Sequence, residues 1–213
     1  MKIKYPRTYH LPWSEGSTND DKTLGNAKCF ENKFVVVTEK MDGENTTMYY
    51  DSIHARSLDS KHHPSRDWVK AFHAGLAYGM EGSAIKLGIN PSDFRICGEN
   101  VYAKHSIHYK ELETYFYGFS VWGGEYCLSW DDTAKIFNEL GITSTPLLYL
   151  GVFDEKIIKS LSDYREGYVV RLASEFHITD FAKSVAKFVR ANHVQTDEHW
   201  AHKAVVPNQL RRK

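Results

Sequence analysis

The sequence predicts an α+β fold, with antiparallel sheets flanked by helices. Segments rich in β-branched and aromatic residues recur along the chain, and this composition is typical of strands. Only two stretches carry the apolar spacing of an amphipathic helix. These two stretches do not alternate regularly with the strand-like segments, so the order of elements argues against a parallel βαβ arrangement.

The first third of the chain is predicted to form an irregular arm followed by a hairpin. Residues 1–30 are polar and rich in turn-forming residues, which indicates an arm with little regular structure. Residues 34–38 and 45–50 have strand-like compositions, and the turn dipeptide Asp42-Gly43 lies between them. We therefore expect these two segments to pair as a β-hairpin.

Two helices and three further strands are expected after the hairpin. One helix is predicted over residues 67–80 by apolar side chains at fourfold spacing, namely Trp68, Phe72, Leu76 and Met80. The other is predicted over residues 131–140, with Asp131 as its N-cap and Gly141 as its stop. The strands are predicted over residues 94–102, 115–122 and 167–172. Alternation along the second of these strands places Tyr115, Tyr117 and Phe119 on one face.

Length and composition predict a single intracellular domain. The 213 residues can bury a core without a metal or disulfide staple, and no linker divides residues 1–213. The three cysteines form no CxxC pair, which favours a reducing, cytoplasmic location and argues against a cysteine-based zinc site. No apolar run approaches the ~20 residues that span a bilayer, so we expect no membrane contact. Equal numbers of acidic and basic residues mean that any nucleic acid must bind a local basic face.

Six short segments along the chain contain charged or aromatic residues that can take part in chemistry. In chain order they are Glu39-Lys40-Met41-Asp42-Gly43-Glu44-Asn45, His54-Ala55-Arg56, Gly98-Glu99-Asn100, Tyr117-Gly118-Phe119, Glu166-Gly167-Tyr168-Val169-Val170-Arg171 and Ala186-Lys187-Phe188-Val189-Arg190. Each is weak alone, since a lysine beside a turn is usually a solvated charge and a strand phenylalanine usually belongs to the core. In this order they resemble the motifs of the covalent nucleotidyltransferases, which are ATP-dependent RNA and DNA ligases and mRNA capping enzymes.

The resemblance covers about residues 34–190 and implies a fold and a reaction. Asn45 and residues 98–107 are most similar to RNA ligases of the Rnl2-like branch. The implied fold is that of the ligase adenylylation domain. In the implied reaction Lys40 takes AMP from ATP and passes it to the 5′-phosphate of RNA, and a 3′-hydroxyl then displaces AMP. Only the neutral amine can attack phosphorus. We therefore expect Lys187, bound Mg²⁺ and partial desolvation to lower the Lys40 pKa.

The resemblance also assigns the other site residues. Glu39 would accept the adenine amine, and Phe119 would stack on the base, with Tyr117 as a rival for that role. Glu99 would contact the ribose and, together with Glu166, provide the carboxylates for Mg²⁺ or Mn²⁺. The implied phosphate contacts are Asn45, Arg56, Lys187 and Arg190. Arg190 departs from the family pattern of two lysines one residue apart, and on a strand it would face away from Lys187.

Several alternatives stay open at this stage. A minimal DNA ligase or a capping guanylyltransferase shares the lysine chemistry, and an inactive RNA-binding module would share only the fold. The RNA substrate could be a nicked duplex, a broken tRNA or free single strands. About twenty residues follow the last motif, so we expect a monomer with a short tail after about residue 195 and no appended OB domain.

Overall fold

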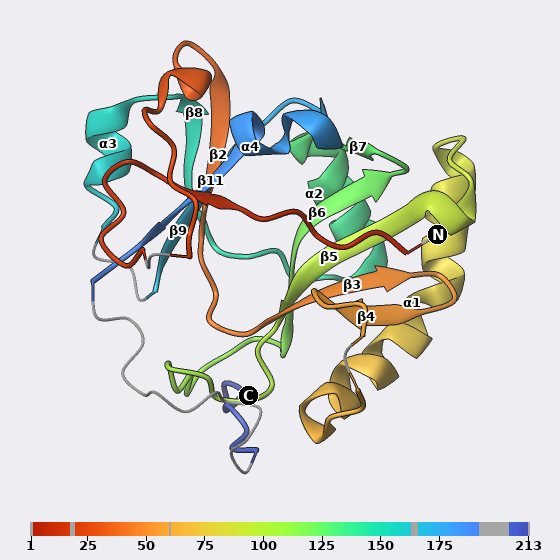
Figure 1. Cartoon of the computed structure of the whole chain (residues 1–213). Helices are drawn as coiled ribbons and strands as arrows, with labels where there is room; N and C mark the ends of the chain where they lie inside the picture. The colour runs from red at the N-terminus through yellow and green to blue at the C-terminus, as the bar shows by residue number, and fades with distance from the viewer. Residues whose placement is uncertain (1, 18–19, 60, 163–165, 192–204, 213) are drawn as a thin grey trace.

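Two β-sheets form the centre of the structure, a computed structural model that describes residues 2–17, 20–59, 61–162, 166–191 and 205–212 (Figure 1). The five-stranded sheet has the order β1-β11-β9-β2-β8, and the six-stranded sheet has the order β10-β7-β6-β5-β3-β4. All neighbours are antiparallel except β1 and β11, which are parallel. The predicted α+β class is therefore confirmed.

The strands and helices have the following bounds. The five-stranded sheet contains β1 Tyr9–His10, β2 Phe34–Glu39, β8 Leu147–Val152, β9 Gly167–Leu172 and β11 Val185–Val189. The six-stranded sheet contains β3 Glu44–Tyr49, β4 Ile53–Ala55, β5 Phe94–Asn100, β6 Phe116–Gly123, β7 Tyr126–Cys127 and β10 Phe176–His177. The α-helices are α1 Asp67–Lys86, α2 Trp130–Leu140, α3 Glu155–Lys159 and α4 Phe181–Ser184. Short 3₁₀ helices span Lys28–Phe30, Pro64–Arg66, Pro91–Asp93 and Ile178–Asp180.

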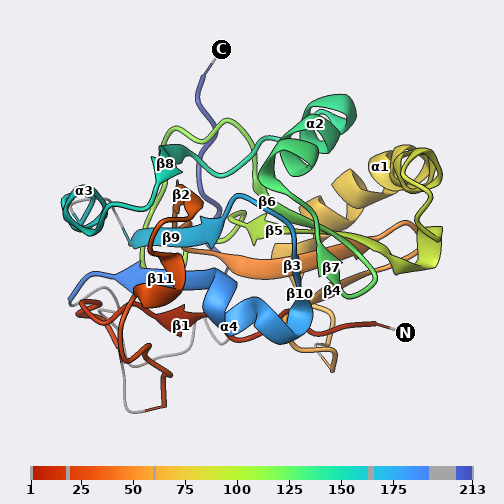
Figure 2. The same ribbon diagram turned by 90° about the horizontal axis from the view of Figure 1, so that it is seen from above.

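The six-stranded sheet is covered differently on its two faces. Helices α1 and α2 lie on one side of it, and the N-terminal arm runs along the other side toward the facing sheet (Figure 2). Val69 of α1 and Phe137 of α2 belong to the same buried cluster as Phe116 of β6. Trp122 of β6 and Val170 of β9 belong to a second cluster, which joins the two sheets. The N-terminal arm and a pocket therefore lie on the face of the six-stranded sheet that is turned toward the other sheet.

The predicted hairpin over residues 34–50 is wrong. Strand β2 pairs with β8 and β9 in one sheet, whereas β3 pairs with β4 and β5 in the other. Strand β2 is buried from Val35 to Glu39, in keeping with its place between β9 and β8 in the sheet. The chain crosses between the sheets at Gly43, where a Cβ atom would lie 2.5 Å from the Asn100 carbonyl oxygen. A side chain at Gly43 would therefore clash with the end of β5.

The two predicted helices exist with different starts and ends. Helix α1 begins at Asp67 as predicted and continues past Met80 to Lys86. Helix α2 begins one residue before the prediction, because Ser129 and not Asp131 is its N-cap; the Ser129 hydroxyl accepts the Asp132 N–H at 3.1 Å. Gly141 ends α2 with a φ of 66°, as the sequence predicts. In the described part of the chain, no helix has both the length and the apolar character needed to span a bilayer.

Both ends of the chain are anchored more firmly than expected. Within the arm, His10 lies on a short strand beside β11, and its side chain is buried. Near the other end, Asn208 is buried against the loop that follows β5. Its side-chain amide donates to the Val101 carbonyl at 2.8 Å, and its side-chain oxygen accepts the Tyr109 N–H at 2.8 Å. Residues 205–212 of the predicted tail therefore brace that loop.

Candidate active site

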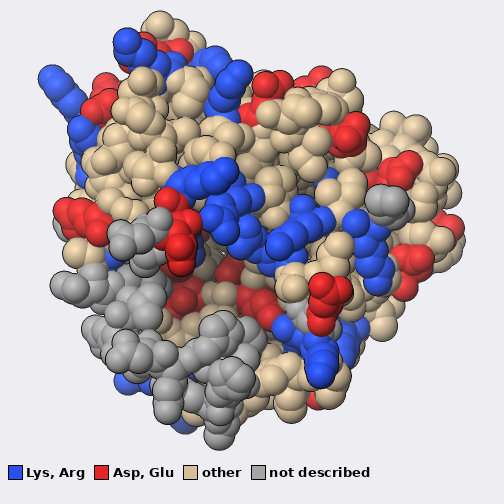
Figure 3. Space-filling view, viewed as in Figure 1, with Lys and Arg blue, Asp and Glu red and all other residues tan. Residues whose placement is uncertain are grey.

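A pocket of about 310 Å³ opens between the two sheets. This size suits a nucleotide-sized ligand. Its charged lining residues are Arg7, Asp20, Asp21, Glu39, Lys40, Arg56, Glu99, Arg171 and Lys187. On this face of the molecule, carboxylates lie on the floor of a hollow and Lys and Arg side chains gather beside it (Figure 3). The fold thus brings most of the predicted site residues to one place.

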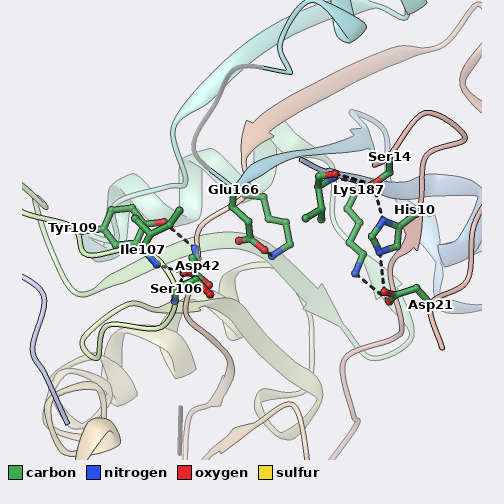
Figure 4. Close-up of polar contacts among 11 residues, drawn as sticks. His10, Ser14, Asp21, Asp42, Ser106, Ile107, Tyr109, Glu166 and Lys187 are labelled. Atoms are coloured by element: carbon green, nitrogen blue, oxygen red, sulfur yellow. Dashed lines mark hydrogen bonds and ion pairs between the residues drawn. The ribbon is translucent and has the colours of Figure 1, made fainter. Parts of the chain in front are cut away.

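Lys40 lies directly after β2, where the two sheets diverge. Its backbone N–H donates to the Gly167 carbonyl at 2.9 Å, which extends the pairing with β9 by one residue. Its ammonium donates to the Glu166 carboxylate, and this carboxylate is almost fully buried (Figure 4). The Lys40 side chain is 24% exposed, so its amine lies against the protein yet remains open to the pocket.

The expectation of a lowered Lys40 pKa is wrong for the protein without ligands. Burial favours the neutral amine, but the negative charges of Glu166, Glu99 and Asp42 outweigh it, so the pKa of Lys40 is raised. Lys187, which we expected to lower this pKa, is paired elsewhere. Without nucleotide, Lys40 is therefore held as an ammonium ion, which cannot act as a nucleophile.

Glu99 lies on β5, opposite Asn45 of β3 in the sheet register. Burial is the main cause that raises the pKa of Glu99 to about 8, and the nearby carboxylates Glu166 and Asp42 act in the same direction. The ammonium of Lys40 opposes this shift. Glu166, Glu99 and Asp42 thus lie close enough to one another and to Lys40 for their charges to interact.

This donor set fits a hard divalent cation. Within the described residues, no three His, Cys, Asp or Glu side chains are close enough to hold a metal ion by themselves. Mg²⁺ is usually held by one or two carboxylates together with water and substrate phosphates, so an all-protein cage is not required. Glu99 and Glu166 are the residues that would hold it: Glu99 is partly buried and lines the pocket, and Glu166 is buried beside Lys40.

Lys187 faces the pocket from β11 and makes an ion pair that the sequence does not predict. Its ammonium lies 3.6 Å from the carboxylate of Asp21 in the arm, and the same carboxylate lies 3.4 Å from His10 Nε2 (Figure 4). Burial and the charge of Lys40 lower the pKa of Lys187, against the effect of Asp21. Burial, followed by Lys187, also lowers the pKa of His10. The arm therefore supplies the counter-charge for the strand lysine.

Phe119 lines the pocket, whereas Tyr117 does not. The pairing of β5 with β6 shifts by one residue, so that Cys97 lies opposite Ser120 and Gly98 lies opposite Gly118. Phe119 falls in this bulge, which breaks the alternation that we expected. Tyr117 instead joins a buried cluster with Met41 and Tyr109. The structure thus favours Phe119 over Tyr117 as the aromatic surface for a base.

The remaining predicted residues divide between the pocket and its surroundings. Glu39, Asn45 and Arg56 line the pocket, and the Arg56 N–H donates to the Asn45 carbonyl at 3.0 Å. Arg190 follows the end of β11 and is not among the lining residues; its N–H donates to the Glu166 carbonyl at 3.1 Å. Its contact with a nucleotide stays a prediction.

Sequence reasoning did not assign two groups of residues that shape this site. The arm lines the pocket with Tyr5, Arg7 and Asp21, although its polar composition resembles that of any surface loop. Asp42 has a structural task, because its carboxylate accepts the backbone N–H groups of Ser106 and Ile107 at 2.8 and 2.6 Å. The Gly that follows Asp42 signals a turn, but nothing in the sequence indicates this distant partner.

Comparison with protein families decides the identity of the chain. A family model for RNA ligases matches residues 33–189. The chain belongs to the RNA ligase family. The search of curated proteins found no match. The Rnl2-like branch that the sequence suggested stays a prediction.

Solved structures of an RNA ligase from Naegleria gruberi share the fold. The Naegleria structure with pyrophosphate matches the present chain with a TM-score of 0.55 and 18% sequence identity. A variant of the Naegleria protein with ATP and Mn matches it with a TM-score of 0.52 and 17% identity. These two matches cover 87% of this chain but only 57% of the Naegleria chains. A further variant with AMP and Mn matches at 0.51, with 17% identity and coverage of 89% and 62%. The chain therefore spans somewhat more than half of the length of the solved proteins.

Proposed function

We propose that this protein is an ATP-dependent RNA ligase that works through a lysine–AMP intermediate. The observation that carries the proposal is the convergence of Lys40, Glu99 and Lys187 on one pocket, from three strands or strand ends that are distant in the sequence. Membership of the RNA ligase family supports the substrate class. The Naegleria structures with ATP, AMP, Mn and pyrophosphate support ATP as the nucleotide substrate of this protein and a divalent metal as its cofactor.

In the first step the Lys40 amine attacks the α-phosphorus of ATP. A P–N bond forms, the bond to the β-phosphate oxygen breaks, and pyrophosphate leaves. The Lys40 ammonium must first give up a proton, so its ion pair with Glu166 has to be broken when ATP and metal bind. Bound Mg²⁺ or Mn²⁺ would neutralise charge on the phosphates and on Glu99 and Glu166.

Other residues of this pocket hold the nucleotide in place. Phe119 offers a ring face to the adenine, and Glu39 offers a carboxylate to its amino group. The charge of Lys40 lowers the pKa of Lys187, so the two side chains lie near each other, as expected if both contact the same phosphate. Its positive charge would then offset the negative charge that develops on the α-phosphate.

In the second and third steps the AMP group moves to RNA and is then displaced. An oxygen of the RNA 5′-phosphate attacks the lysine-bound phosphorus, which frees Lys40 and forms a 5′–5′ pyrophosphate linkage. A 3′-hydroxyl then attacks the RNA phosphorus, and AMP leaves. Asn45 and Arg56 are suited to hold the RNA phosphate, since Arg offers a forked set of donors. The same chemistry on DNA ends remains an alternative.

The proposal is tested by self-labelling with ATP and Mg²⁺. The wild-type protein should gain the mass of one AMP on the peptide that contains Met41, Asp42 and Gly43. Lys40→Ala should abolish the adduct, and Lys40→Arg should do the same because a guanidinium stays protonated. Both variants should still seal, at least in part, a strand that already bears a 5′-AMP. Labelling that persists in Lys40→Ala, or that maps to Lys187, would contradict the proposal.

A panel of substrates separates RNA ligation from the alternatives. We expect joining of 5′-phosphate and 3′-hydroxyl RNA ends and little joining when both ends are DNA. Labelling by GTP in place of ATP would indicate a capping-type enzyme. A protein that binds RNA but carries no label would be an inactive binding module.

A further inference from the structure

Thr145 lies at the point where the two sheets are joined behind the pocket. Its backbone N–H donates to the Gly118 carbonyl of β6 at 2.9 Å. The carbonyl of the next residue, Pro146, accepts the Glu39 N–H of β2 at 2.8 Å. Thr145 is thus hydrogen-bonded to the neighbour of Phe119, and the residue that follows it is hydrogen-bonded to Glu39. These are the residues assigned to the face and to the amino group of the base.

The Thr145 side chain lines the pocket but lacks a hydrogen-bond partner. The residue is 3% exposed, and no group in the described part of the chain hydrogen-bonds its hydroxyl. A buried hydroxyl without a partner is costly, and most buried hydroxyls in proteins are paired. A ligand that seats against the back of the pocket would supply the missing partner.

Two other polar side chains that line the pocket, Ser120 and Arg171, make hydrogen bonds within the fold. The Ser120 hydroxyl accepts the Trp122 indole N–H at 3.0 Å. The Arg171 guanidinium donates to the Leu128 carbonyl at 2.8 Å and to the Leu172 carbonyl at 3.0 Å. These contacts hold Ser120 and Arg171 in the wall, whereas the Thr145 hydroxyl has no partner in the described part of the chain and is free to donate to a ligand.

We propose that the Thr145 hydroxyl is a specificity determinant that donates a hydrogen bond to a ring nitrogen of adenine. The inference rests on the proposed function, since it assumes that ATP occupies this pocket. Adenine carries an acceptor nitrogen, N1 or N7, on either side of its amino group. A carboxylate that accepts from the amine and a hydroxyl that donates to the ring nitrogen are therefore complementary to one edge of the base.

The test compares Thr145→Val and Thr145→Ser with wild type in self-adenylylation. Valine keeps the shape of threonine but removes the hydroxyl, and serine keeps the hydroxyl. Each protein is given ATP, 1-deaza-ATP and 7-deaza-ATP, which lack one ring nitrogen or the other. The control is Thr133→Val, because Thr133 in α2 is fully buried and its hydroxyl also lacks a partner within the described chain, but it does not line the pocket.

Wild type should use ATP with a KM about 3- to 10-fold lower than that of one of the two deaza analogues, the range expected for one neutral hydrogen bond. Thr145→Val should raise the KM for ATP by a similar factor, erase the preference for ATP over that analogue and leave the thermal midpoint unchanged or higher. Thr145→Ser should restore the preference. Thr133→Val should leave all three KM values unchanged.

Results of two kinds would overturn the role of Thr145, one in wild type and one in the Thr145→Val variant. One is a wild-type protein that labels Lys40 but uses ATP and both deaza analogues equally well. The other is a Thr145→Val variant that keeps the full wild-type preference, or that loses activity equally with all three nucleotides together with a lower thermal midpoint. If wild type itself fails to label Lys40, the proposed function fails first, so the two failures are distinguishable.

Discussion

The Lys40 ammonium donates a hydrogen bond to the Glu166 carboxylate, so the proposed nucleophile is held in its unreactive form before ligands bind. Burial alone would favour the neutral amine, but Glu166, Glu99 and Asp42 reverse the sign of the pKa shift. The carboxylates that attract a metal ion are thus the groups that protect the lysine. We therefore expect the binding of ATP and metal and the deprotonation of Lys40 to occur together.

Glu166→Gln should lower the pKa of Lys40 in the metal-free protein, because it removes the strongest opposing charge and keeps the shape of the side chain. Lys40 should then react at a lower pH with an amine-specific acylating reagent, as read by peptide mass mapping. Self-adenylylation should nevertheless fall by about 100-fold or more, since an electrostatic group at the reacting centre is lost. Unchanged Lys40 labelling in this variant would show that the ion pair does not control the amine.

Glu39→Ala should weaken the preference for ATP over GTP more than it slows the reaction with ATP. Glu39 is 8% exposed and lines the pocket, where its carboxylate can accept from the adenine amine. Guanine places a carbonyl at that position, which would set two acceptors against each other. Glu39→Gln keeps one acceptor oxygen, so its preference for ATP over GTP should lie between that of wild type and that of Glu39→Ala. Equal labelling of wild type by both nucleotides would refute the assignment.

The sequence predicts the residue types of the site better than it predicts how they are brought together. The short motifs that contain Lys40 and Lys187 are local patterns, and the structure places both residues at one pocket. The pairing of residues 34–50 is misjudged because β2 finds its partners more than 100 residues later in the chain. The turn dipeptide at Asp42 favours a local hairpin, and it carries no information about the distant strands that pair with β2 instead.

The broken alternation between Tyr117 and Phe119, and the role of Asp21, were missed for a different physical reason. A single-residue bulge in β6 moves Phe119 out of register with Tyr117, and no sequence feature marks that bulge. Asp21 comes from a polar arm in which an aspartate is usually a solvated turn residue. Its partner Lys187 is 166 positions away, so their contact depends on the complete fold.

Asn208→Ala should destabilise the protein by about 2–4 kcal/mol, because it leaves buried backbone groups of the loop after β5 without partners. The measurement is the free energy of unfolding from denaturant titration. Gln209→Ala is the matched control, since Gln209 is the exposed neighbour, and it should change stability by less than about 0.5 kcal/mol. Equal effects of the two substitutions would contradict the bracing role of Asn208.

His54 should make the protein less stable in mild acid. Burial is the main cause that lowers the pKa of His54, with help from Lys2 and Arg95. The unfolded chain therefore takes up a proton below its own pKa of about 6.5, while the native state resists it. The contribution of His54 is complete above about pH 6.5 and is lost as the pH falls from there through the folded pKa.

The measurement for His54 is the unfolding free energy between pH 7.5 and pH 5. His54→Gln should flatten the loss of stability in this range. His62→Gln is the control, because the side chain of His62 is 63% exposed and should not contribute. A pH profile that His54→Gln leaves as steep as that of wild type would rule out this explanation.

The arm should supply phosphate contacts for RNA beside the pocket. Lys2, Lys4 and Arg7 are exposed, whereas Ile3 and Tyr5 between them are partly buried. The Ile3 N–H donates to the Tyr49 hydroxyl at 2.9 Å, and the Tyr5 ring packs edge-on against Phe119 at 5.3 Å. These anchors fix a basic stripe on the face of the six-stranded sheet opposite α1 and α2 (Figure 2). The stripe leads away from the site of the proposed chemistry.

Lys2→Ala combined with Lys4→Ala should reduce the salt dependence of sealing. Each phosphate contact adds about 0.7 to 0.9 to the log–log slope of affinity against salt, so losing two contacts should lower that slope by about 1.5. The measurement is the KM for a pre-adenylylated RNA strand at several salt concentrations, and self-adenylylation by ATP should be unaffected. Lys86→Ala combined with Lys135→Ala removes the same charge from α1 and α2 on the opposite face, so this control should leave the slope unchanged. If both double variants lower the slope equally, net charge and not the arm determines the salt response.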